Sequence, residues 1–308
     1  MGLVRESVFA YLFGAGFATD AFNVAFRIPN FLRDLFAESA LSAAFVPAFV
    51  ESLRNQDRKR AWRFASNMLN VIALVTAGLA LLGMLGSPEI DRLIAAGFAA
   101  EPAKLALTTA LTRIMFPFLF WVALAAWAMG VLNACGVFFV PAIAPAAFNV
   151  FSIVVPVLTF GLFRARGLEP IHGMAWGVLA GALAQFAVQV PSLGRQGFRY
   201  HAALDLRAPE LVRVFRRWLP MVLGFATWQV NFLVNTFLLT FLPEGSVTWV
   251  NYAYRIQHLP AGLFGAAIGS VALAEYSHGI NHADHTALQT RFRHALSLVS
   301  ILTLPAAT

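Results

Sequence analysis

Long apolar blocks separated by short charged stretches make up most of the chain. A helix needs about 20 apolar residues to cross a bilayer, whereas a barrel strand needs about ten residues of alternating polarity. The run VIALVTAGLALLGMLG at 71–86 has no such alternation. The pattern therefore predicts an all-α fold, a polytopic transmembrane helix bundle with about nine spans. The predicted spans lie at residues 2–16, 20–50, 62–86, 104–133, 138–163, 171–194, 218–242, 249–276 and 292–308.

Composition excludes several other classes of protein. Of the 308 residues 59% are hydrophobic and 12% are charged, whereas soluble proteins are about half apolar and a quarter charged. Disorder is excluded by the same balance, and a disulfide scaffold is excluded because Cys135 is the only cysteine. The net charge is +7, but the basic residues form no domain of their own, so no nucleic-acid partner is expected.

The positive residues are unevenly distributed over the connections between spans. Three connections hold thirteen Lys and Arg residues, and the three that would lie on the opposite side hold four. Positive residues favour the cytoplasmic side, so the first group and the amino terminus are predicted to lie inside. The two groups are 51–63, 195–217 and 277–293, and 87–104, 164–170 and 243–248.

The apolar blocks at both ends of the chain are shortened, which indicates that sequence is missing before and after them. Only a few residues precede Arg5 in the first apolar block, and the last block stops at LTLPAAT without a polar tail. We therefore expect the interior of a longer protein; the alternative is a chain with short exposed termini.

Several charged residues remain within or at the ends of the predicted spans. An arginine at the bilayer centre costs about 2.5–3.5 kcal/mol on insertion scales, so a set of them predicts a hydrated cavity or a partner. The planar guanidinium suits phosphate and carboxylate groups, so the surplus of arginine predicts an anionic substrate group. The arginines are Arg5, Arg27, Arg33, Arg113 and Arg255, and the acids are Asp20, Asp34, Glu38 and Glu275.

The alternative is that these charges are structural. Arg5 would then pair with Glu6, Arg33 would pair with Asp34 or Glu38, and Arg113 would reach the membrane interface.

Pro29 interrupts the span that holds Arg27, Arg33, Asp34 and Glu38. A broken intramembrane helix is tolerated where it lines a cavity, which favours the substrate-binding hypothesis here. Arg27, Asp34 and Glu38 are spaced i, i+7 and i+11, so they share one helical face if the helix resumes after the proline.

A faint internal repeat is typical of transporters. Ala25-Phe26-Arg27-Ile28 recurs as Ala253-Tyr254-Arg255-Ile256, with further matches at the same offset of 228 residues. Transporters are often built from two related bundles around a central site, which predicts that Arg27 and Arg255 face each other. Chance similarity between two apolar helices is the competing explanation.

The segment FGAGFATDAFNVAFRIPNFLRDLFAESALSAAFVPAF at 13–49 closely resembles the amino-terminal region of the MurJ/MviN family, the lipid II flippases of bacterial peptidoglycan synthesis. The likeness runs along essentially the whole chain. It continues through ALTTALTRIMFPFLF (106–120), VLNACGVFFVPAIAPAAFNV (131–150) and GSVTWVNYAYRIQHLPAGLFGAAIGSVAL (245–273).

This resemblance implies a fold and a division of the chain. Family members resemble two six-helix bundles of the multidrug/oligosaccharidyl-lipid/polysaccharide exporter superfamily, with two extra helices. The expected parts are an amino-terminal bundle at 1–195 with an incomplete first helix, a basic cytoplasmic linker at 196–217, and the first three helices of the second bundle at 218–308.

The resemblance also implies substrate-binding residues. The cavity arginines of the family correspond to Arg5, Arg33 and Arg255, its cavity aspartate to Asp20 and its glutamate to Glu38; Arg27 is added from the internal repeat. Two departures exist. An earlier arginine of the family has no counterpart, and the acidic residue that often precedes the arginine of the eighth span is Tyr254, which leaves Arg255 without its nearest counter-charge.

The implied function is translocation of lipid II across the bacterial cytoplasmic membrane. Lipid II carries a pyrophosphate, a disaccharide and a peptide on a polyprenyl tail, and a basic cavity would hold its head group during alternating access. The chain has no Walker A loop, so coupling to an ion or to the membrane potential is expected, and no other cofactor. The expected partners are lipid II, membrane lipids and cell-wall synthesis proteins.

Other functions stay open as alternatives. The chain could export another polyprenyl-linked glycan, act as a cation or drug antiporter of the same superfamily, or be a scaffold for cell-wall enzymes. A cation exporter would prefer carboxylates to the surplus of arginine. An enzyme is not expected, because no GxSxG, HExxH or GxGxxG motif is present.

The remaining motifs favour structural roles. His278, His282 and His285 have the i, i+4, i+7 spacing of metal ligands, but they fall in a predicted loop, and no metal is expected. Two GxxxG pairs, at 177–181 and 265–269, predict close helix packing, and Cys135 is expected to pack as a small apolar residue.

Overall fold

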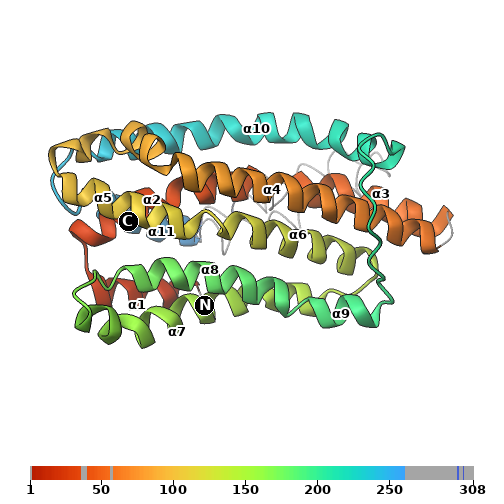
Figure 1. Ribbon diagram of the computed structural model, residues 1–308, viewed down its shortest axis with the longest axis horizontal. Helices are drawn as coiled ribbons and strands as arrows, with labels where there is room; N and C mark the ends of the chain where they lie inside the picture. The colour runs from red at the N-terminus through yellow and green to blue at the C-terminus, as the bar shows by residue number, and fades with distance from the viewer. Residues whose placement is uncertain (1, 36–39, 56–57, 261–296, 298–300, 302–308) are drawn as a thin grey trace. The chain divides into compact units, whose positions relative to one another are not determined.

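A computed structural model of the chain describes residues 2–35, 40–55, 58–260, 297 and 301. Every regular element that it describes is a helix (Figure 1), which confirms the all-α prediction. The helices are α1 (Gly2–Phe13), α2 (Phe17–Arg33), α3 (Ala40–Asn55), α4 (Arg58–Ile94), the 3₁₀ helix η2 (Ala96–Ala100), α5 (Pro102–Met115), α6 (Phe118–Ala134), α7 (Phe139–Ala165), α8 (His172–Ala187), α9 (Val190–Arg195), α10 (Pro209–Leu239) and α11 (Ser246–Pro260).

Four helices of the described residues are long and apolar enough to cross a membrane. They are α4, the run of α5 and α6 at Pro102–Ala134, α7, and the run of α8 and α9 at His172–Arg195. A fifth is α10, if its two halves, bent by 42° between Gly224 and Gln229, form one span. The chain is therefore a candidate multi-pass membrane protein, and the count of about nine spans stays a prediction.

Several helix boundaries differ from the sequence-based prediction. The predicted loops at 51–63 and 87–104 are largely helical, because α4 extends from Arg58 to Ile94 and α5 begins at Pro102. The block at 20–50 forms two helices, α2 and α3. Pro29 does not interrupt α2, which continues to Arg33; a proline removes one helical hydrogen bond, and the rest of the helix retains its own.

Helix ends follow local chemistry. Pro102 and Pro209 occupy the first turns of α5 and α10, where the missing proline N–H would have had no helical partner. Gly136 and Gly167 adopt φ angles of 79° and 69° just beyond α6 and α7, a conformation that glycine adopts without a steric penalty. Because α10 begins at Pro209, the last part of the predicted 196–217 linker is helical.

The chain divides into two compact units, Met1–Val247 and Thr248–Thr308. Most of the described part of the second unit is helix α11. The first unit has two large apolar clusters. One surrounds Trp127 and joins α3, α4 and α6, and the other surrounds Met115 and Phe118 and joins α1, α2, α5, α7 and α8.

Two predictions about packing are confirmed in the first unit. Helices α7 and α8 lie side by side (Figure 1), and a Cβ added at Gly181 would lie 2.7 Å from the carbonyl oxygen of Phe148. The pair Gly177 and Gly181 therefore allows the two backbones to approach closely. Cys135 packs against the Trp127 cluster, and burial raises the pKa of its thiol.

Polar residues on α4 bond the irregular segment at 199–208, which lies within the predicted 196–217 linker. From here on, the word linker means residues 199–208. Asn67 donates to the carbonyl oxygen of Asp205 at 2.8 Å and accepts from its N–H at 2.8 Å. Asn70 donates to the carbonyl of Ala203 at 2.7 Å, and Ser66 accepts from the N–H of His201 at 3.1 Å. The linker backbone therefore takes the place of water as the hydrogen-bond partner of these side chains.

Replacement of Asn67 by alanine should release the linker from α4. Asn67 makes two of the bonds described above, and each backbone group that loses its partner becomes free to move away from the helix. We expect trypsin to cleave at Arg199 and Arg207 several-fold faster in this variant. The control is Asn149→Ala, because among the described residues Asn149 bonds within its own helix, to the Pro145 carbonyl. Equal cleavage rates in the two variants would contradict the prediction.

Candidate functional site

Arg5 lies on α1 in a partly buried ion pair. Its guanidinium contacts the Glu6 carboxylate at 2.9 Å, and its Cζ lies 5.8 Å and 5.7 Å from the ring centres of Phe9 and Phe148. Aromatic faces attract a guanidinium within about 6 Å. The ion pair is the one that the structural alternative predicts, but it joins neighbouring residues and links no two helices.

The end of α2 carries a second ion pair, which faces α10. Arg33 contacts Asp34 at 2.7 Å, and the side-chain amide of Gln229 on α10 donates to the other carboxylate oxygen of Asp34 at 2.6 Å. Both charged side chains are about one fifth exposed. Asp34 therefore has two partners, one of them on a helix nearly 200 residues away in sequence.

Arg27 lies two turns earlier on the same helix and also faces α10. Its Cζ is 5.3 Å from the ring centre of Phe232. Asp34 contacts Gln229, and Arg27 contacts Phe232. The later residue of α2 therefore lies beside the earlier residue of α10, so the two helices run antiparallel where they touch. Gln229 and Phe232 were not among the site residues predicted from the sequence. A neutral amide and a phenylalanine within an apolar block do not stand out as candidate site residues.

Asp20 is buried in a third cluster, which we call the clasp. Its carboxylate contacts the Lys104 ammonium at 3.3 Å and accepts the backbone N–H of Gly245 at 2.7 Å. The exposed fraction is 2% for the Asp20 side chain and 3% for that of Lys104. Glu244 accepts the N–H of Phe17 at 2.6 Å. The clasp therefore joins the start of α2, the start of α5 and the turn that follows α10.

The position of Lys104 corrects the sequence analysis. It was expected as a loop cation, whereas the structure buries its ammonium 4.4 Å from the ring centre of Phe98. Its charge is therefore compensated inside the protein. A role for Asp20 in substrate binding stays a prediction.

Arg113 bonds a residue of the neighbouring helix α4. It is exposed on α5, and its Nε donates to the Ser87 hydroxyl on α4 at 3.0 Å. Nearby, Asp91 is buried and accepts a hydrogen bond from Thr112 at 3.1 Å. Asp91 has no signal as a site residue in the sequence, because residues 87–104 are predicted to form a loop, whereas Asp91 lies in α4.

The other predicted site residues are placed as follows. Arg255 lies on α11, on an exposed part of the helix. Glu38, the three histidines at 278, 282 and 285, and the second glycine pair at 265 and 269 lie outside the described residues. The predicted roles of Arg5, Asp20, Arg27, Arg33, Glu38 and Arg255 in substrate binding stay predictions.

Comparisons with known proteins agree with the arrangement of the helices. The sequence profile of a family described as lipid II flippase MurJ matches residues 9–308. A curated relative, lipid II flippase MurJ of Burkholderia cenocepacia, is 35% identical over 311 residues, which cover 99% of this chain and 59% of the relative. A solved structure of lipid II flippase MurJ, in an inward closed conformation, covers 99% of this chain and 61% of its own, with TM-score 0.80 and 27% identity.

A more distant structure shares the fold alone. A multidrug resistance MATE family transporter of the MOP superfamily, in an inward-facing conformation, has a TM-score of 0.66 at 18% identity and covers 98% of this chain. The chain spans about three fifths of the length of the curated relatives that it matches. Since the family profile covers nearly all of its residues, the chain belongs to the lipid II flippase MurJ family.

Proposed function

We propose that this chain forms part of a flippase that carries lipid II across the bacterial cytoplasmic membrane. The observation that carries the proposal is the match of the lipid II flippase MurJ family to residues 9–308. The proposed site residues are Arg5, Arg27, Arg33 and Arg255, with Asp20 and Glu38 as the acidic members of the set.

The local geometry of two of these arginines supports the proposal. Arg5 and Arg33 each pair with the next residue in sequence, and the Asp34 carboxylate of the second pair also accepts the hydrogen bond from Gln229 on α10. The Arg5 and Arg33 side chains are 16% and 24% exposed. A pyrophosphate could therefore replace the carboxylate partner, and the guanidinium would exchange one anion for another without being left buried and uncompensated.

Translocation would follow from alternating access by two related bundles. A charged head group crosses lipid at a high free-energy cost, so the cavity must open to one side at a time while the polyprenyl tail stays in the bilayer. The proposed orientation has the amino terminus in the cytoplasm. Coupling to an ion or to the membrane potential would supply direction.

Replacement of Arg33 by alanine should weaken lipid II binding by about tenfold, because one charge-assisted hydrogen bond to a phosphate contributes about 1.5–3 kcal/mol. Native mass spectrometry of the purified chain with lipid II, undecaprenyl phosphate or a cationic drug measures this. The matched control is Arg113→Ala, which removes an exposed arginine that bonds Ser87. Lipid II binding that is equal in wild type and both variants would contradict the proposal.

A further inference from the structure

Asp91 is a buried acidic residue that the proposed function does not use. It lies on the last turn of α4, and 2% of its surface is exposed. The hydroxyl of Thr112 on α5 donates to its Oδ1 at 3.1 Å, and Thr109, one turn earlier on α5, lies close to the same carboxyl group. Its Oδ2 is also buried and forms no hydrogen bond with any residue that the structure describes. The two oxygens of the carboxyl group therefore have different surroundings.

Arg113 on α5 is the cation that acts on Asp91, but in the described part of the chain the two side chains form no ion pair. The Nε of Arg113 donates instead to the Ser87 hydroxyl at 3.0 Å. That hydroxyl donates in turn to the carbonyl oxygen of Met84 at 3.0 Å. Pro88 has no N–H, so it leaves this carbonyl without its usual helical partner. Ser87 therefore holds the guanidinium one turn before Asp91.

Other charged groups near this end of α4 already have partners. Glu89 and Arg92, on α4 itself, pair with each other at 2.7 Å and are exposed. Lys104, two turns before Thr112 on α5, pairs with Asp20. These two cations are therefore engaged elsewhere.

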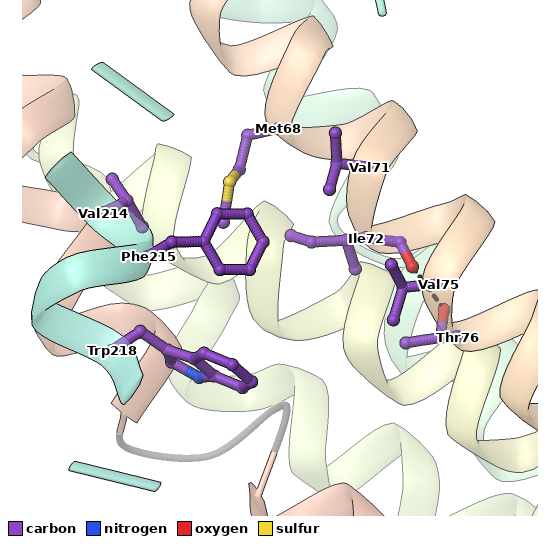
Figure 2. A pocket seen from close by; sticks show the side chains of 8 residues that line it. All are labelled: Met68, Val71, Ile72, Val75, Thr76, Val214, Phe215 and Trp218. Carbon is purple, nitrogen blue, oxygen red and sulfur yellow. Dashed lines mark hydrogen bonds between the residues drawn. The ribbon is translucent and has the colours of Figure 1, made fainter. Parts of the chain in front are cut away.

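The remaining described helices that contact α4 bring no charge to the end that carries Asp91. Helices η2 and α6 contain no titratable side chain, and neither does the half of α10 at 229–239. Helix α3 and the first half of α10, which do carry charges, lie at the other end of α4 (Figure 1). Even there the facing surfaces include an apolar patch, and Figure 2 shows Met68, Val71, Ile72 and Val75 opposite Val214, Phe215 and Trp218.

An ionised carboxyl group is costly in these surroundings. A buried charge without a partner raises the free energy of the fold far more than a buried neutral hydroxyl does. The hydrogen bond also suits the protonated form, since Oδ1 can be the carbonyl oxygen that accepts from Thr112 while Oδ2 carries the hydrogen. A metal cation fits less well, because it needs several oxygen ligands and would be repelled by Arg113. The geometry therefore favours a proton as the ligand.

We propose that Asp91 binds a proton at Oδ2, and that release of this proton moves the Arg113 guanidinium from Ser87 to Asp91. The proton passes to water at the end of the helix, where Arg92 and Leu93 are exposed. The O–H bond breaks and its electron pair stays on the carboxylate, which then accepts charge-assisted hydrogen bonds from Arg113. Ser87 and Asp91 are four residues apart, so they share a face of α4. One proton therefore switches the contact between α4 and α5.

Infrared spectroscopy of the purified chain in detergent detects this proton, because a protonated carboxyl group has a carbonyl stretching band that a carboxylate lacks. We expect the wild type to retain such a band at a pH where exposed carboxyl groups are ionised. Asp91→Asn should remove the band. The matched control is Glu89→Gln, which removes an exposed acid at the same end of the helix and should leave the band unchanged. No band in the wild type, or an equal band in Asp91→Asn, would overturn the proposal.

The movement of Arg113 has its own test. Arg113→Gln should let the infrared band of Asp91 persist to a higher pH, because the carboxylate would lose its cation. The control is Arg92→Gln, which removes an exposed arginine one residue from Asp91. Loss of the band at the same pH in both variants would overturn the role of Arg113.

Thermal unfolding at several pH values gives the sign of the effect. Asparagine stays neutral, whereas wild-type Asp91 must release its proton as the pH rises. The melting temperature of Asp91→Asn should therefore gain several degrees on that of the wild type between acidic and neutral pH. A permanently ionised Asp91 predicts the reverse, with Asp91→Asn the less stable protein at neutral pH and a smaller loss at acidic pH.

Sodium tests the nature of the ligand. Stabilisation of the wild type, but not of Asp91→Asn, by sodium relative to choline would overturn the proton in favour of a metal cation. We expect the two salts to give equal melting temperatures. The inference goes beyond the proposed function and does not rest on it, and none of these measurements uses lipid II, so failure of one is distinguishable from failure of the other.

Discussion

Replacement of Asp20 by asparagine is expected to destabilise the first unit by about 3–5 kcal/mol, because it leaves the Lys104 ammonium buried without its counter-charge. Both side chains are almost fully buried, so water cannot replace the lost partner. Asparagine keeps an oxygen that can accept the Gly245 N–H, so the change isolates the charge. Thermal unfolding in detergent, followed by circular dichroism, measures the effect.

A double-mutant cycle identifies the cause. Lys104→Met alone should also destabilise the protein, because it leaves the Asp20 carboxylate buried and unpaired. The double variant Asp20→Asn with Lys104→Met should recover most of the loss, since neither charge remains. Additive losses would show that the two residues act separately, and the clasp would then have to be explained by the Gly245 bond alone.

Replacement of Gly181 by alanine is the second change with a large expected effect. The added methyl group would lie within 3 Å of both the backbone oxygen and the ring of Phe148. Backbone atoms of α7 cannot rotate away as a flexible side chain can, so the two helices must separate. We expect a loss of about 1–3 kcal/mol, as for other overpacked positions, measured by thermal unfolding in detergent.

The matched control is Gly161→Ala on the other helix of the same pair. A Cβ at Gly161 has no atom within 4 Å, so this variant gains helix propensity of up to about 1 kcal/mol without a clash. The two substitutions are chemically identical, so their opposite signs would isolate the close approach of α7 and α8. Equal unfolding temperatures of Gly181→Ala and Gly161→Ala would contradict the prediction that α7 and α8 approach closely at Gly181.

One pairing of connections, 51–63 with 195–217, could be predicted from the sequence, because charge in a membrane protein is confined to the two ends of the helices. Arg58 donates to the carbonyl of Gln196 at 2.9 Å, which joins two of the predicted cytoplasmic segments. Gly97 donates its N–H to the Thr240 hydroxyl at 3.1 Å, which brings together segments near the opposite end. The helical class and the close packing at Gly177 and Gly181 also follow from local pattern.

The partners of the charged residues could not be predicted in the same way. The prediction that Arg33 pairs with Asp34 or Glu38 needed only neighbours in sequence, and the structure shows the Asp34 pair. The contacts of Asp34 with Gln229 and of Asp20 with Lys104 cross 195 and 84 residues. No periodicity in the sequence encodes which distant helix faces a given side chain.

The sequence by itself determined the membrane class, the helical fold and the family, because each depends on hydrophobic runs and motifs that are local in the chain. Only the tertiary structure decided that Lys104 is a buried counter-ion, that Asn67 and Asn70 hold the linker, and that Asp91 is buried beside α5. The same neighbouring residues in sequence are compatible with a charged or amide side chain that is solvated, paired or buried. The helix that packs against it supplies the partner and the burial that decide among these states.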